Sequence, residues 1–174
     1  IKSLQERVGK KELNIMDLGG GVGTALHDVK RLHPELITYN VTKDEEITGY
    51  PADFNVICFM ERMPLAMKGK IHYIFSNMAT RYLLFCDKVI HGCVEALASG
   101  GEMNVFFSSE RSHNPDEEDI KRRMQEAYTY LKDLESSGKI ALEVNGSFST
   151  NFGGSFESLQ GSLYPASNVK IIKH

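Results

Sequence analysis

A cluster of glycines between an apolar run and an amphipathic run is the strongest constraint on how this chain folds. Four glycines fall within residues 19–23, directly after the compact apolar run 12–18. Apolar residues then recur at helical spacing through residues 25–32, and Pro34 ends the pattern. A buried strand that turns through glycine into a helix is the repeating unit of a parallel α/β sheet.

The rest of the chain continues this alternation of strands and helices. The other strand candidates are residues 35–41, 54–60, 70–77, 102–107, 139–144 and 168–173. One helical stripe covers residues 85–98, and Ser99-Gly100-Gly101 is typical of a helix stop. Another helix is expected from the cap residue Asn114 to the exit glycine Gly138, with Pro115 in its first turn.

The spacing of these elements predicts the fold class. Strands that alternate with helices favour parallel pairing with right-handed crossovers. At the end of the chain, two strand candidates are separated by a loop with no convincing helix between them, so we expect that final pair to be antiparallel. The predicted fold is α/β: a doubly wound, mostly parallel seven-stranded sheet with an antiparallel last strand and helices on both faces.

Length and composition exclude several classes of protein. The 174 residues suit a single domain, 1–174, and the first residue, Ile1 instead of Met, is consistent with a fragment of a longer chain. No apolar run reaches the roughly 18 residues of a membrane span, and no signal peptide opens the chain. The three cysteines form neither a disulfide framework nor a zinc motif, so we expect no metal and a cytoplasmic location.

The glycine cluster admits several explanations. A tight turn with positive φ needs one glycine, whereas four in five positions indicate that something approaches the backbone closely. A P-loop is excluded because no Gly-Lys-Ser/Thr follows the cluster. A dinucleotide-binding loop fits poorly, because Thr24 occupies its third glycine position and Asp17 is an acidic residue that such loops usually lack. These two mismatches weigh against a nicotinamide-dependent oxidoreductase.

The pattern Asp17-x-Gly19-x-Gly21-x-Gly23 resembles the first motif of class I S-adenosylmethionine (SAM)-dependent methyltransferases. The resemblance covers residues 12–107, including the stretch from the fourth strand candidate through the next helix to an apolar strand. The resemblance implies that SAM is the cofactor and that Asp17 faces its cationic amino group. It also implies that the glycines lie against the amino-acid tail and ribose of SAM; these are Gly19, Gly20, Gly21 and Gly23.

The resemblance also implies further cofactor contacts. Asn40 takes the place of the acid that grips the ribose at the end of the second strand, and residues 44–46 are the alternative if the register slips. Met60 and Glu61 fall at the adenine position, where the alternative is that residues 59–60 belong to the core. Asn77 and Met78 would follow the fourth strand, at the edge where open α/β sheets bind ligands.

The chemistry of methyl transfer and the local sequence restrict the class of methyl acceptor only in part. Methyl transfer from a sulfonium needs mainly positioning and exclusion of water. The Asn-Pro-Pro-Tyr signature of enzymes acting on base amines or glutamine amides is absent, and residues 76–82 read SNMATRY instead. This favours a small-molecule acceptor, and the net charge of −3 gives no reason to expect nucleic acid.

The sequence therefore leaves two hypotheses about the function of the protein. The first is a SAM-dependent methyltransferase acting on a small molecule or a protein. The alternative is a methyltransferase-like binding or interaction module that has lost turnover. His113 and Tyr82 are candidates for substrate contact without an assigned catalytic role, and residues 146–162 form either an aromatic substrate lid or a long surface loop. The oligomeric state is left open.

Overall fold

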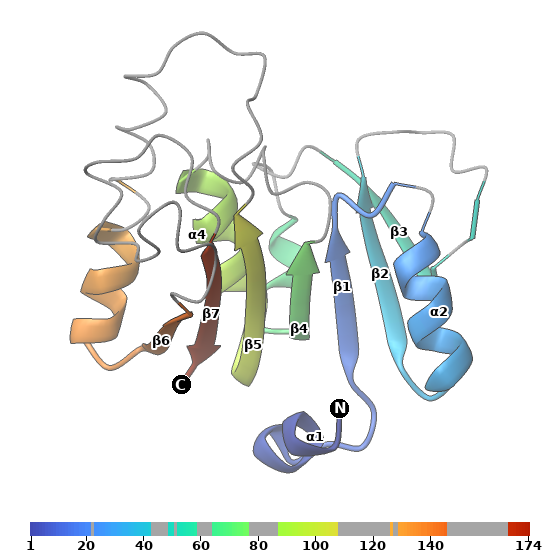
Figure 1. Ribbon diagram of the computed structural model, residues 1–174, viewed down its shortest axis with the longest axis horizontal. Helices are drawn as coiled ribbons and strands as arrows, with labels where there is room; N and C mark the ends of the chain where they lie inside the picture. Colours follow the sequence, from blue (N-terminus) through green and yellow to red (C-terminus); the bar gives the residue numbers. More distant parts are fainter. Residues whose placement is uncertain are drawn as a thin grey trace, which may run out of the picture.

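One seven-stranded sheet organises the described part of the chain. The computed structural model describes residues 1–21, 23–42, 49–50, 52–58, 64–76, 87–107, 126, 129–145 and 167–174. The strand order within these ranges is β3-β2-β1-β4-β5-β7-β6 (Figure 1). The strands are β1 Asn14–Leu18, β2 Ile37–Thr42, β3 Phe54–Ile57, β4 Ile71–Ser76, β5 Leu97–Phe107, β6 Ile140–Asn145 and β7 Ser167–Lys173.

The pairing confirms the predicted fold class. Strands β3, β2, β1, β4 and β5 pair in parallel, whereas β7 runs antiparallel to both β5 and β6. β1 lies in the middle of the parallel part, and four of its five residues are buried. A strand covered on both faces has no solvent side, which is why Ile15, Met16 and Leu18 are apolar and Asp17 is a buried exception.

Helices on opposite faces build two separate cores. Helix α2, Thr24–Leu32, buries Leu26 against Leu13 and Ile15. Helix α4, Asp87–Ala96, buries a stripe of apolar side chains against Met16 and Ile74 on the other face of the sheet. Because neighbouring residues of a strand point to opposite faces, β1 contributes alternate side chains to each core.

A short N-terminal helix is present that the sequence analysis did not anticipate. Helix α1, Lys2–Val8, lies near the amino end of β1 and ends at Gly9, which has a φ of 70° (Figure 1). Arg7 Nε donates to the carbonyl oxygen of Gly100 at 2.8 Å, and Arg7 also forms an ion pair with Glu102. The helix has a single buried side chain, Leu4, so its sequence carries no recognisable apolar stripe.

The expected helix stop at Ser99-Gly100-Gly101 is wrong. Helix α4 ends at Ala96, and residues 97–107 already belong to β5. Gly100 has a φ of 76°, and the β4–β5 register shifts between Ile71 and Tyr73. A Cβ on Gly101 would lie 3.0 Å from the carbonyl oxygen of Ile71. Gly100 and Gly101 therefore allow an irregularity inside β5, where neighbouring backbones lie too close together to leave room for side chains.

Distant residues satisfy the C-terminal carbonyl groups of α4 instead. The Gly69 N–H donates to the carbonyl of Glu95 at 2.9 Å. Lys173 Nζ, on the last strand, donates to the carbonyls of Val94 at 2.9 Å and Leu97 at 2.7 Å. The last carbonyls of a helix lack partners within it, and a lysine also favours that end of the helix dipole.

The expected exit of the later helix is confirmed. Residues 129–136 are helical, and Gly138 follows with a φ of 68°. The Gly138 N–H donates to the Glu135 carbonyl and the Lys139 N–H to the Leu134 carbonyl, each at 2.9 Å, which is the Schellman pattern. The predicted start at Asn114 and Pro115 lies outside the described residues. The 3-10 helix η2, Leu65–Met67, precedes β4.

Candidate cofactor site

The glycine loop joins the carboxyl end of β1 to the first residue of α2. Gly19, Gly21 and Gly23 have φ angles of 78°, 52° and 81°, which other residues rarely adopt. The Gly19 N–H donates to the Val41 carbonyl at 2.8 Å, and the Gly23 N–H donates to the Gly20 carbonyl at 2.9 Å. The loop is therefore tied to β2 and closed on itself before the helix begins.

The glycines differ in what surrounds them. A Cβ on Gly20 would lie 2.6 Å from both Asp17 Oδ2 and Asn40 Oδ1, and a Cβ on Gly23 would lie 2.2 Å from the Tyr50 carbonyl oxygen. Gly21 is exposed, and apart from its chain neighbours no atom of the described residues lies within 4 Å of the corresponding position on it. Gly20 and Gly23 are therefore required by packing within the protein, whereas Gly21 leaves its space to solvent or to a ligand.

Asp17 lies directly beneath this loop. Its exposed fraction is 3%, and its strand neighbours are Asn40 on β2 and Phe75 on β4. Burial raises the pKa of the Asp17 carboxyl from 3.8 to about 7, because a carboxylate away from water lacks solvation. A carboxyl with a pKa near neutrality can gain or lose a proton under physiological conditions.

Asn40 is fully buried and supports the loop from below. Its Nδ2 donates to the carbonyl oxygen of Gly21 at 2.9 Å. Asn40 lies two residues before the end of β2 at Thr42, and its Oδ1 has no hydrogen-bond partner among the described residues. Its assignment as a ribose contact stays a prediction, and the structure places it on the inner side of the glycine loop.

Sequence reasoning missed two other residues around the loop. Ser76, 4% exposed at the end of β4, donates its hydroxyl hydrogen to the Leu18 carbonyl at 2.8 Å. Tyr50 closes over Gly23 with its backbone, and its ring stacks on His27 of α2 at 4.1 Å between centroids. A serine at the carboxyl end of an apolar strand was a visible signal, whereas Tyr50 belongs to no sequence pattern that we recognised.

Several predicted site residues lie outside the described part of the chain. They are Met60 and Glu61 at the expected adenine position, Asn77 and Met78 after β4, the substrate candidates His113 and Tyr82, and residues 146–162 of the expected lid. The structure brings together Asp17, Gly19, Gly20, Gly21, Gly23 and Asn40.

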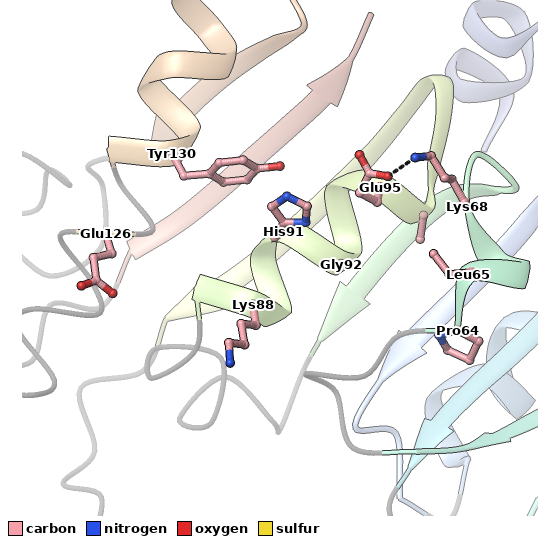
Figure 2. Close-up of a pocket in the computed structure, with 10 residues that line it drawn as sticks. Pro64, Leu65, Lys68, Lys88, His91, Gly92, Glu95, Glu126 and Tyr130 are labelled. Atoms are coloured by element: carbon pink, nitrogen blue, oxygen red, sulfur yellow. Dashed lines mark ion pairs between the residues drawn. The ribbon is translucent and has the colours of Figure 1, made fainter.

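A separate cavity of about 450 Å³ lies against α4 (Figure 2). His91 of α4 stacks on Tyr130 of the later helix at 4.9 Å, and Lys68 forms an ion pair with Glu95 at 2.5 Å. None of the glycine-loop residues lines this cavity. Within the described ranges, no helix is both long and apolar enough for a bilayer crossing.

Comparison with known proteins links this arrangement to methyltransferases. No family model and no curated protein matches the sequence. Among solved structures, the plantazolicin methyltransferase BpumL in complex with a desmethylPZN analog and SAH has a TM-score of 0.62 at 14% identity, over 99% of this chain and 80% of that one. The aminoglycoside resistance methyltransferase NpmB1 has a TM-score of 0.59 at 17% identity, over 99% and 93%.

A third similar structure is a 16S rRNA (adenine(1408)-N(1))-methyltransferase mutant from Catenulisporales acidiphilia. Its TM-score is 0.55 at 14% identity, with 99% of this chain and 92% of that one covered. Another structure of an enzyme with that description contains the cosubstrate SAM and has a TM-score of 0.52. These likenesses extend over nearly the whole chain, so the chain has the Rossmann-like fold of these methyltransferase structures.

Proposed function

We propose that this protein is a SAM-dependent methyltransferase that holds its cofactor against the glycine loop. The observation that carries the proposal is the difference between the glycines. Gly20 is packed against the buried carboxyl of Asp17 and Gly23 against the Tyr50 backbone, whereas Gly21, next to Gly20, meets no atom of the described residues within 4 Å. Such a surface accepts a ligand that lies flat on the backbone and carries a positive charge near Asp17.

The residues around the loop have distinct roles in this proposal. Asp17 pairs with the ammonium group of the ligand, and Asn40 fixes the carbonyl of Gly21. The N–H groups at the start of α2 supply donors and a positive dipole end to polar ligand atoms. SAM supplies an activated methyl group, so the protein has mainly to orient the acceptor and exclude water.

The proposed acceptor is a small molecule or a protein. The net charge of −3 gives no general attraction to phosphate backbones. The similar solved structures include methyltransferases named for 16S rRNA and for plantazolicin, so RNA belongs among the acceptors to be tested, against our expectation from the sequence.

Calorimetric titration with SAM, S-adenosylhomocysteine and NAD tests the cofactor. We expect the first two to bind and NAD not to bind. Gly21→Val places a side chain in the open space, so affinity should fall at least tenfold. Gly138→Val is the matched control, because Gly138 has a similar positive φ and equally open surroundings at a distant helix end. Binding of NAD alone, or equal losses in the two variants, would contradict the proposed site.

Transfer of a labelled methyl group tests turnover and acceptor class together. Purified protein and labelled SAM are incubated with separate small-molecule, protein and RNA fractions. Label in the small-molecule or protein fraction supports the proposal, and label in RNA alone shows that the acceptor assignment is wrong. Cofactor binding without transfer to any fraction would favour the binding module that has lost turnover.

A further inference from the structure

The side-chain carbonyl oxygen of Asn40, beneath the glycine loop, is a buried hydrogen-bond acceptor that lacks a donor among the described residues. The side chain is fully buried, and its Nδ2 faces the Gly21 carbonyl at 2.9 Å. Only the NH₂ end of an amide can face a carbonyl oxygen, so the orientation of Asn40 is chemically determined. Its Oδ1 is then left without a hydrogen-bond partner among the described residues. A buried acceptor without a donor is costly.

The carboxyl of Asp17 is a chemically suitable partner for this oxygen. Asp17 and Asn40 are paired in the β1–β2 register, and Asp17 Oδ2 and Asn40 Oδ1 each lie 2.6 Å from the Cβ position above Gly20. An ionised carboxylate has no hydrogen to donate and would set two acceptors side by side. A protonated carboxyl has one O–H donor, which is what the Asn40 oxygen lacks.

We propose that Asn40 and Asp17 share a proton beneath the glycine loop of the ligand-free protein, and that a ligand carrying an ammonium group expels it. This inference rests on the proposed function, because SAM is the ligand that brings the ammonium group. Asn40 acts as a positioning residue for the loop and as acceptor of the shared proton. Asp17 makes the site selective for cationic ligands.

The proton and the charges balance in this exchange. Binding removes one proton from the Asp17 carboxyl and delivers it to the buffer, and the ammonium group keeps all of its own protons. The resulting carboxylate is paired with the positive ligand, whose N–H groups replace the lost donor. No other chemical change occurs in the step.

The surroundings of Asp17 are consistent with this assignment. The titratable groups on the neighbouring described elements are Tyr39 on β2, His72 and Tyr73 on β4, His27, Asp28, Lys30 and Arg31 on α2, and Tyr50 beside Gly23. Among the described residues, burial is the cause that brings the pKa of Asp17 to about 7. The ligand-free carboxyl is therefore mostly protonated in mildly acidic solution.

The test is calorimetric titration of the intact chain with SAM in buffers of different ionisation enthalpy. At pH 5.5 we expect release of about one proton per SAM bound, and at pH 7.0 about half a proton. The affinity should rise by more than about tenfold over this range, in which the ligand amino group stays mostly charged. 5′-Methylthioadenosine, which lacks the amino-acid tail, should bind without releasing a proton.

Two variants separate the proton exchange from a structural effect. Asp17→Asn keeps an uncharged side chain that can donate to Asn40, so it should fold, release no proton and show a flat pH profile. Asn40→Ala removes the acceptor, so the pH midpoint of proton release should fall by at least half a unit. An unchanged midpoint would overturn the role of Asn40.

The outcomes distinguish this inference from the proposed function. If SAM does not bind the wild-type chain, the proposed function fails. If SAM binds but neither proton release nor pH dependence is observed, the shared proton is wrong and the function stands. Equal proton release by the wild type and Asp17→Asn would assign the proton to another group and overturn the inference.

Discussion

At the residue scale, the glycines of residues 19–23 differ in their surroundings and therefore in why each must be glycine. The sequence shows that four of the five residues 19–23 are glycines, which indicates that another group approaches the backbone closely there. It does not show that Gly20 packs on Asp17 and Asn40, or that Gly23 packs on Tyr50. Asn40 and Tyr50 come from β2 and the segment after it, so their contacts with the glycines exist only once β2 has paired with β1.

The buried carboxyl of Asp17 is expected to destabilise the fold above neutral pH. Its folded-state pKa of about 7 exceeds the ordinary 3.8, so the folded protein binds more protons than the unfolded chain between these values. Stability attributable to Asp17 is therefore lost as the pH rises from about 4 to about 7, by about 4 kcal/mol in all. Asp17→Asn should recover most of that at pH 8 and little at pH 4.

Urea unfolding at both pH values measures this difference. Asp28→Asn, an exposed change on α2, is the control and should alter stability by less than about 0.5 kcal/mol at either pH. If Asp17→Asn gives the same gain at pH 4 and pH 8, ionisation of Asp17 is not the source of the instability.

At the element scale, the sequence predicted what depends on local patterns and missed what depends on distant contacts. All seven strands were predicted because their apolar runs are short and bounded. Helix α1 was missed because it buries only Leu4, and residues 99–101 were misread because a glycine pair inside a strand resembles a helix exit. The true end of α4 is set by Lys173, far along the chain.

The contact between Lys173 and α4 gives a stability prediction. Lys173→Met keeps the aliphatic length but removes the donors to the carbonyls of Val94 and Leu97. Leaving partly buried carbonyls unpaired should cost about 1–3 kcal/mol, measured by chemical denaturation. Lys170→Met on the same strand is the control. It removes only the ion pair with Glu143, worth less than about 1 kcal/mol. Equal losses in the two variants would contradict a specific cap.

At the scale of the whole molecule, the fold class follows from the order of the elements. The alternation of strands and helices gives parallel pairing, and the missing helix before the last strand gives the antiparallel pair. The insertion of β7 between β5 and β6 could not be derived that way, because it depends on a long connection returning to the sheet. The candidate site was predicted at the glycine loop because its signal, Asp17 and the four glycines, lies within one short local stretch of sequence.

Loss of the Arg7 contact tests how the N-terminal helix is held on the sheet. Arg7→Met removes the donor to Gly100 and the ion pair with Glu102. Both groups are partly exposed, so the global stability should fall by about 1 kcal/mol or less, while α1 becomes more open. Hydrogen exchange should show faster exchange in residues 2–9 and unchanged protection of β1. Equal acceleration in both regions would show that α1 is part of the cooperative core.

The cap that Lys173 places on α4 also bears on protein synthesis. The ribosome releases α4 and β5 well before it releases β7, because Lys173 follows both by a long stretch of chain. Until then the carbonyls of Val94 and Leu97 must be hydrated or covered by a chaperone. The nascent chain therefore cannot add β6 to the sheet in the order in which it is made, because β7 must first lie between β5 and β6.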